Sequence, residues 1–128
     1  MSNIKNILIG ILALLFTIST QLFAQKNGEN LNGKWQTEDN TIVEITKTGN
    51  YFSIKQVSSP KEKDKLNNGK IIGKELVFSE NTDYKGIVID PSNNKEYKGL
   101  FTIAADGKSL KLKVKWGFIN FSETWKKI

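Results

Sequence analysis

One short stretch of the sequence places an oxygen-bearing side chain at every second position: VIDPSNNKEYKG, residues 88–99. The side chains concerned belong to Asp90, Ser92, Asn94 and Glu96. Alternating oxygen ligands begin the calcium loop of helix–loop–helix proteins, which also needs glycine at its sixth position and a bidentate glutamate at its twelfth. Counted from Asp90, those positions hold Lys95 and Phe101. We therefore expect no metal ion here.

The same stretch suits a tight turn between two strands. Pro91 fixes one backbone angle, and the short polar side chains around it hydrogen-bond to nearby backbone groups or tolerate left-handed geometry. Tyr97, Gly99 and Phe101 then alternate along one face of the following segment. The prediction for residues 88–99 is a hairpin rather than a metal site.

The residue types that the chain lacks exclude several kinds of catalysis. The sequence contains neither histidine nor cysteine, which removes Ser–His and Cys–His nucleophiles, the usual zinc and copper sites, and thiol redox chemistry. Paired carboxylates remain, and they hydrolyse glycosidic bonds when they flank a cleft. Most acidic residues, however, lie in predicted turns and loops: Glu38, Asp39, Asp64, Asp83 and Asp106. We expect no catalytic activity and no cofactor, and a cell-envelope hydrolase is the weaker alternative.

Glu123 is the one carboxylate that strand alternation turns inward. It shares its parity with Ile119, Phe121 and Trp125 in the last predicted strand. A carboxylate on an apolar face needs a partner, or a bulge that moves it off that face. Glu123 is therefore either a polar anchor for an interior ligand or displaced by a bulge near the strand end, and we expect the bulge.

The charge pattern argues against nucleic acid as a partner. The formal net charge is +6, and every basic residue is lysine. Bidentate recognition of phosphates and guanine edges favours arginine, which the sequence lacks. We interpret the positive charge as an aid to solubility, with a weak attraction to anionic surfaces.

The first residues are typical of a secretory signal peptide. Lys5 precedes an apolar run at 7–18, and a polar break leads to the small residue Ala24. The run is shorter than the roughly 20 residues that cross a bilayer, although a single-pass anchor is the alternative. We predict a signal peptide at 1–24 and a single exported domain at 25–128, in the periplasm or outside the cell. No later segment is apolar enough for a stable membrane span, and the lack of cysteine excludes lipid anchoring through that residue.

Beyond a polar lead-in, apolar and polar residues alternate with period two, as in half-buried strands. Turn signals at intervals of about 8–12 residues separate the segments, which is typical of antiparallel sandwiches and barrels. The predicted strands are 33–37, 41–47, 51–57, two short strands within 70–79, 84–90, 96–104, 109–116 and 119–127. The charged segment at 58–69 is not strand and is either a functional flap or a linker.

Segment 109–116 has the clearest alternation. Its apolar residues share one face and should be buried, whereas its lysines share the other. The apolar set is Leu110, Leu112, Val114 and Trp116, and the lysines are Lys111, Lys113 and Lys115. We expect the lysine stripe to be a solvated outer face.

Four motifs occur in an order that resembles a known bacterial family: GKW at 33–35, IDPSNNKEYKG at 89–99, DGKSLKLK at 106–113 and ETWKK at 123–127. Together they are similar to domain-of-unknown-function family 2147, a group of small exported proteins, over nearly all of the chain after the signal peptide. The resemblance implies an all-β, antiparallel, lipocalin-like (calycin-type) barrel of about eight short strands. It implies no activity and no cofactor, because the family has none to carry over.

Individual positions carry the resemblance. They are Gly33, Trp35, Asp90, Pro91, Tyr97, Trp125 and Lys127. In lipocalin-like barrels the opening tryptophan packs under a closing basic residue and plugs one end. The resemblance thus implies a cation–π contact between Trp35 and Lys127, with lysine where the family usually has arginine. The family's frequent cysteine pair is missing.

An eight-stranded barrel holds one small apolar molecule or is filled by its own side chains. We predict binding of a small apolar ligand, lined by Trp35, Phe52, Phe101, Trp116, Phe121 and Glu123. One alternative is that these residues form only the core. Another is that the protein is an envelope module or inhibitor that binds a protein partner through exposed loop aromatics. The loop aromatics are Tyr51, Tyr84 and Phe118.

Overall fold

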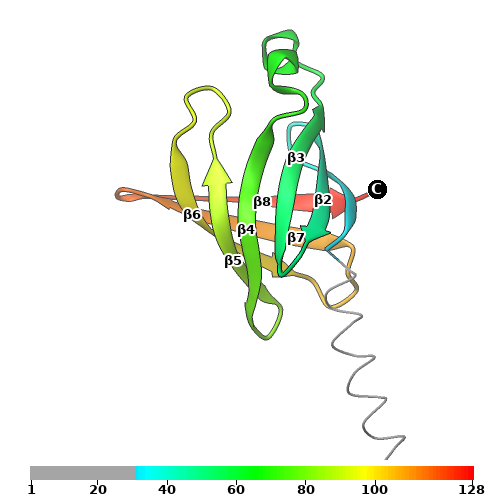
Figure 1. The fold of residues 1–128 in the computed structure, drawn as a ribbon, viewed down its shortest axis with the longest axis vertical. Helices are drawn as coiled ribbons and strands as arrows, with labels where there is room; N and C mark the ends of the chain where they lie inside the picture. The colour runs from blue at the N-terminus through cyan, green and yellow to red at the C-terminus, as the bar shows by residue number, and fades with distance from the viewer. Residues whose placement is uncertain (1–30) are drawn as a thin grey trace, which may run out of the picture. The chain divides into compact units, whose positions relative to one another are not determined.

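The computed structural model describes residues 31–128, so the predicted signal peptide at 1–24 lies outside the described residues. Eight antiparallel strands form a closed barrel in which each strand pairs with its neighbours in sequence and the last pairs with the first (Figure 1). They are β1 (Gly33–Gln36), β2 (Ile42–Thr48), β3 (Tyr51–Ser58), β4 (Ile71–Glu80), β5 (Asp83–Ile89), β6 (Glu96–Ile103), β7 (Ser109–Trp116) and β8 (Ile119–Lys127). The all-β antiparallel barrel expected from the sequence is confirmed.

Alternating side chains give these strands one buried and one solvated face. In β7, Leu110, Leu112 and Val114 are buried, and the lysines between them are exposed. Residues that accept positive φ make the tight turns, among them Gly49 at φ 64° and Gly117 at φ 62°. The solvated lysine face predicted for β7 is therefore confirmed.

β4 is one bent strand rather than the two short strands predicted within 70–79. Its pairing with β5 shifts register between Lys74 and Val77, and Glu75 lies in the left-handed region at φ 57°. Bulges of this kind bend a strand without ending its pairing. Gly73 suggests a turn in the sequence, but the structure places it inside β4, close to the Ile54 side chain of β3. A Cβ at Gly73 would lie 2.8 Å from Ile54 Cδ1, so only glycine fits without movement of Ile54.

Side chains fill the interior beside β5 and β6. Trp35 and Phe101 are fully buried. Gly86 and Gly99 face each other across the two strands and leave room for neighbours, since a Cβ on Gly86 would lie 2.8 Å from Leu76 Cγ. The remaining core residues are Leu31, Val43, Ile45, Phe52, Ile54, Leu76, Tyr84, Ile103, Leu110, Leu112, Val114 and Trp125.

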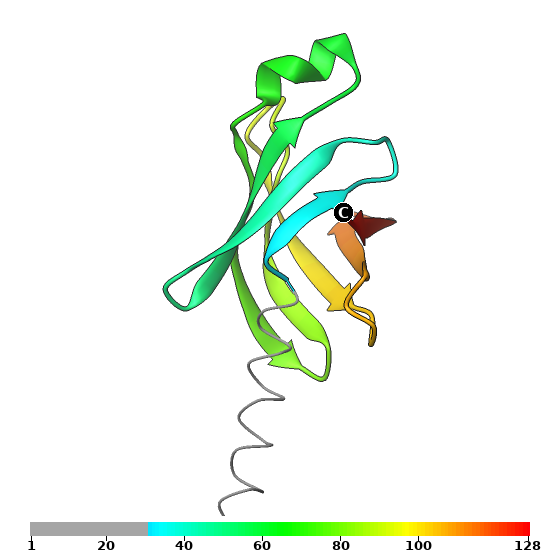
Figure 2. The same ribbon diagram turned by 90° about the vertical axis from the view of Figure 1, so that its right-hand side faces the viewer.

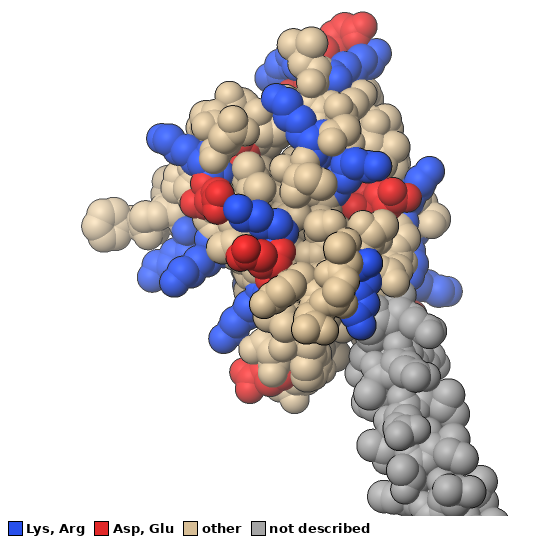
Figure 3. Space-filling model, in the orientation of Figure 1, with Lys and Arg blue, Asp and Glu red and all other residues tan. Residues whose placement is uncertain are grey.

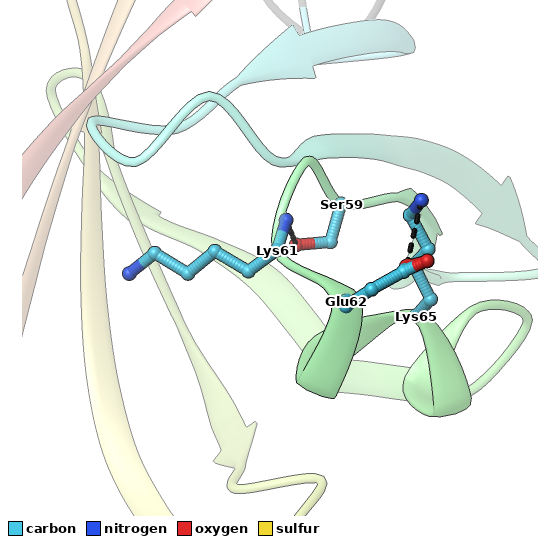
Figure 4. A network of polar contacts seen from close by, with 4 residues as sticks. All are labelled: Ser59, Lys61, Glu62 and Lys65. Carbon is cyan, nitrogen blue, oxygen red and sulfur yellow. Dashed lines mark hydrogen bonds and ion pairs between the residues drawn. The ribbon is translucent and has the colours of Figure 1, made fainter.

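The connection between β3 and β4 contains a short 3-10 helix, η1 (Glu62–Asn67), at one end of the barrel (Figure 2). The buried Gln56 side chain holds the connection by donating hydrogen bonds to the Asp64 carbonyl and to Asn68 Oδ1 at 2.9 and 3.1 Å. Figure 4 shows further local contacts among Ser59, Lys61, Glu62 and Lys65. The sequence does not reveal η1, because it buries no residue and so leaves no periodic pattern. In residues 31–128 no helix is long and apolar enough to cross a membrane.

A short pairing between β1 and β8, which we call the seam, closes the barrel. One hairpin extends beyond the closed part. β1 pairs with β8 at two positions, one of which is Trp35↔Lys127. β7 and β8 pair along their whole length up to the turn at Gly117, whereas β6 pairs with β7 only as far as Val114. The end of the β7–β8 hairpin therefore lacks a paired strand on either side and projects from the barrel (Figure 1).

Candidate functional site

The six predicted ligand-lining residues fall into two groups. Three belong to the closed core: Trp35, Phe52 and Phe101. The other three lie on the β7–β8 hairpin: Trp116, Phe121 and Glu123. Two of the hairpin residues are exposed and Glu123 is half-buried, so the six do not surround one closed cavity.

The hairpin residues nevertheless lie on the core side of the sheet. Phe121 pairs with the buried Val114, and Ile119 pairs with Trp116 two residues farther along β7. Cross-strand partners and residues two apart share one face of a sheet. We call this face the inner shelf; it comprises Trp116, Ile119 and Phe121, together with Tyr97 of β6. The ring centroids of Tyr97 and Trp116 are 5.4 Å apart.

The inner shelf is exposed because the barrel does not cover it. Side-chain exposure is 55% for Trp116, 65% for Ile119 and 45% for Phe121. β6 ends its pairing with β7 before Trp116, and β1 does not pair with this part of β8. The predicted burial of Trp116 is therefore wrong. Alternation in the sequence indicates which face of the sheet a side chain occupies, but it does not indicate whether other strands cover that face.

Glu123 lies at the inner end of the shelf. It pairs with Leu112 in an uninterrupted register, so the predicted bulge is wrong. Its carboxylate accepts a hydrogen bond from the Trp125 indole. Burial raises the pKa of Glu123, the Trp125 hydrogen bond opposes this, and the Asp39 and Glu38 carboxylates raise the pKa further. The result is an inward-facing hydrogen-bond acceptor beside apolar side chains.

The carboxylates of Glu38 and Asp39 lie close to that of Glu123, and each accepts hydrogen bonds from other residues. Glu38 Oε1 accepts a 3.0 Å hydrogen bond from the Thr124 backbone. Burial raises the pKa of Asp39, but hydrogen bonds from Thr37 and Thr41 outweigh it and lower the pKa overall. Within residues 31–128, no three acidic side chains are arranged to hold a metal ion.

The opening and closing residues of the family motif meet at the seam of the barrel. Lys127 Nζ lies 5.4 Å from the ring centroid of Trp35, which confirms the contact that the resemblance implied. The Trp35 indole donates a 3.0 Å hydrogen bond to the Leu31 carbonyl. Gly33 lies at φ 128°, and a Cβ there would meet Lys127 Cε at 3.3 Å. This motif therefore has a structural role.

Residues 89–96 form the predicted turn between β5 and β6. Asp90 Oδ1 accepts hydrogen bonds from the Ser92 backbone and hydroxyl at 2.9 and 2.7 Å, and Asn94 takes φ 60°. Tyr97 follows the turn and joins the inner shelf. The Asp90 carboxylate thus stabilises the turn itself.

The comparison with known proteins agrees with these motifs. Residues 33–127 match the family described as "Uncharacterized protein conserved in bacteria (DUF2147)". The chain belongs to DUF2147. No curated protein matches the chain. Because the DUF2147 description names no activity, the surfaces of the barrel are the remaining guide to function.

The outer face of the DUF2147 barrel carries a second candidate surface, a solvent-open groove of about 940 Å³. We call it the outer groove; its charged residues are Lys85, Lys98, Lys113, Lys115 and Glu75. None of these lysines forms an ion pair with another described residue. Ile87 and Leu100 add apolar surface to its floor. A smaller hollow beside η1, of about 730 Å³, is lined by both acidic and basic residues.

The sequence identifies these surfaces only in part. Lys113 and Lys115 belong to the predicted stripe, but Lys85 joins them from β5, because both it and Lys113 pair with Leu100 of β6. Alternation alone does not give the register that brings them together. The predicted ligand-lining set also omits Ile119, which the structure places on the inner shelf, although the sequence has apolar residues on both sides of the Gly117 turn.

Proposed function

We propose that this DUF2147 protein is an exported, non-catalytic barrel that binds a small, mainly apolar ligand on its inner shelf. The observation that carries the proposal is the exposure of Trp116, Ile119 and Phe121 on the core side of the sheet. Covering apolar surface contributes about 25 cal/mol per Å² removed from water. A ligand on the shelf would therefore extend the core over side chains that the chain leaves uncovered.

The closed part of the barrel is a poorer place for the same ligand. Side chains already crowd Gly86 and Gly99, whose added Cβ atoms would lie 2.8 and 2.7 Å from neighbouring side chains. Interiors packed this tightly do not accept another molecule without moving their own side chains. We therefore place the ligand on the shelf rather than among Trp35, Phe52 and Phe101.

Glu123 favours a particular polar end on the ligand. Its carboxylate faces inward at the end of the shelf and accepts a hydrogen bond from the Trp125 indole. A carboxylate has room for more than one hydrogen bond. A ligand with an apolar chain and a hydrogen-bond donor, such as an alcohol or an amine, complements Glu123, whereas an ionised fatty acid would be repelled.

The export part of the proposal rests on residues 1–24, whose charged start, apolar run and small final residue match a signal peptide. Removal of this segment would leave residues 25–128 as the mature chain. A second candidate function is binding of an envelope protein. The fully exposed Phe118 beside the shelf favours it, because a protein partner would cover more apolar surface than a small ligand.

Titration of the mature chain with 1-dodecanol, followed by tryptophan fluorescence and native mass spectrometry, tests the ligand. Trp35 and Trp125 are buried, so Trp116 should give the main blue shift on binding. Dodecanoate should bind more weakly than dodecanol at neutral pH, and Glu123→Gln should reduce that difference. A bare mass and an unchanged spectrum with both compounds would overturn the ligand and favour the protein partner.

A matched pair of variants locates the site. Phe121→Ser should weaken dodecanol binding about fivefold, because a ligand would cover roughly half of a phenylalanine side chain, or about 1 kcal/mol. Tyr51→Ser removes a similarly exposed aromatic from the β2–β3 hairpin and should leave binding unchanged. Equal effects of the two substitutions would mean that binding is not localised to the shelf.

A further inference from the structure

The end of the β7–β8 hairpin is an apolar projection. We call residues 116–119, WGFI, the hairpin tip. Phe118 is fully exposed at 107%, and Trp116 and Ile119 flank it with most of their surface in water. The tip contains no charged residue and extends beyond the other strands (Figure 1). Tyr97 packs against Trp116, but no described residue covers Phe118.

Uncompensated positive charge lies directly behind the tip. Lys115 adjoins Trp116, and Lys113 and Lys98 follow on the outer face of β7 and β6. Together with Lys85 they provide four positive charges in the outer groove, against the single carboxylate of Glu75. Figure 3 shows lysine side chains beside the projecting, uncharged tip.

An apolar end with cations behind it matches the layers of an anionic bilayer. Tryptophan, phenylalanine and isoleucine partition to the boundary between headgroups and acyl chains, and lysines bind the anionic headgroups. Lys115 and Lys113 lie about 3 and 10 Å along the strand from Trp116, at a rise of about 3.3 Å per residue. The headgroup layer is roughly 5–8 Å deep, so a tip inserted end-on would place these lysines within it or at its surface.

Other partners match only half of this arrangement. A soluble acidic ligand would account for the lysines but not for a fully exposed phenylalanine at the tip. An apolar protein surface would account for the tip but would leave four lysines without anionic partners.

We propose that the hairpin tip and the lysines of the outer groove dock the barrel on an anionic lipid bilayer. This inference goes beyond the proposed function and does not rest on it, because docking needs no ligand on the inner shelf, although Trp116 and Ile119 belong to both surfaces.

Co-sedimentation of the mature chain with vesicles tests the proposal. Vesicles of phosphatidylcholine with about one-third phosphatidylglycerol should bind the protein at low salt, more weakly as salt rises, and far better than pure phosphatidylcholine vesicles. No binding to the anionic vesicles at low salt, or equal binding to both kinds, would overturn the proposal. An acidic ligand or a protein partner would then remain as the occupant.

Two sets of variants separate docking from net charge. Lys113→Gln with Lys115→Gln should weaken vesicle binding about 25-fold, at about fivefold per lysine. Lys108→Gln with Lys126→Gln removes the same charge near the opposite end of the hairpin and should have a much smaller effect. Equal losses in the two double variants would mean that only net charge matters, and would overturn the docking surface.

The tip has its own variant and its own control. Phe118→Ser should weaken vesicle binding at least tenfold, because it removes the most exposed apolar side chain of the tip. Tyr51→Ser on another hairpin should not. An unchanged Phe118→Ser variant would overturn insertion of the tip. Dodecanol titration without vesicles reports the inner shelf separately, so either idea can fail while the other stands, and circular dichroism confirms that each variant is folded.

Discussion

Replacing Gly86 with alanine measures how completely the closed barrel is filled. A Cβ on Gly86 would lie 2.8 Å from Cγ and Cδ1 of Leu76 and 3.0 Å from its Cα. Leu76 is fully buried on the adjacent strand. Gly86 is not in the left-handed region, so alanine adds crowding rather than backbone strain.

The expected cost follows from these distances. Carbon atoms pack best at about 3.5–4.0 Å, and the Leu76 side chain can rotate away, but its Cα moves only if β4 moves. Overpacking of this kind costs about 1–3 kcal/mol, and the lower chain freedom of alanine when unfolded offsets about 0.4–1 kcal/mol. The net loss should be about 1–2 kcal/mol, which lowers Tm by roughly 4–16 °C in a domain of about 100 residues.

Guanidinium and thermal unfolding of residues 25–128 measure this loss. Gly49→Asn is the control, because nothing lies within 4 Å of an added Cβ at φ 64°, and asparagine accepts that conformation. The control should stay within about 0.5 kcal/mol of the parent chain. An unchanged or higher midpoint for Gly86→Ala would refute the filled interior and favour the closed barrel as the site of the proposed ligand.

The remaining predictions concern Glu123 and Lys127. Burial raises the pKa of Glu123 above 4.5, so the folded chain binds its proton more tightly, and this residue's contribution to stability falls as pH rises from 4.5 through the folded pKa. Glu123→Gln should therefore gain stability relative to the parent between about pH 4 and pH 7 in denaturant titrations, and a constant difference would contradict the raised pKa. Lys127→Met keeps the stem against Gly33 but loses the contact with Trp35, and should lower the free energy of unfolding by about 0.5–1 kcal/mol in the same assay. An unchanged Lys127→Met variant would mean that packing of the stem, not the charge, stabilises the seam.

The barrel could be predicted from the sequence because its strands are half-buried. Leu110, Leu112 and Val114 alternate with lysines in β7, and turn residues such as Gly49 and Asn94 mark where the chain reverses. These are local signals, and local signals specify antiparallel neighbours well. β4 departed from the prediction because Gly73 occurs in turns and in strand bulges alike.

The candidate surfaces depend on relations between strands, which the sequence does not display. Trp116 has the parity of a core residue and is exposed because β6 stops pairing with β7 before it and β1 does not reach this part of β8. Lys85 and Lys113 become neighbours only through their pairing with Leu100. Glu123 keeps its inward position without a bulge because the Trp125 indole, two residues away, meets its carboxylate. Parity therefore predicted which face each side chain occupies, and the extents of the strand pairings decided which of those side chains are exposed.

The seam between β1 and β8 sets the order in which the chain can finish folding. Each other pairing joins strands adjacent in sequence, so those hairpins can form before the seam does. The seam joins Trp35 to Lys127 and must overcome the entropy of closing almost the whole described chain. Until the seam forms, the sheet has two open edges, one on β1 and one on β8. Termination before Lys126 would make that state permanent and leave both edges free to pair with other molecules.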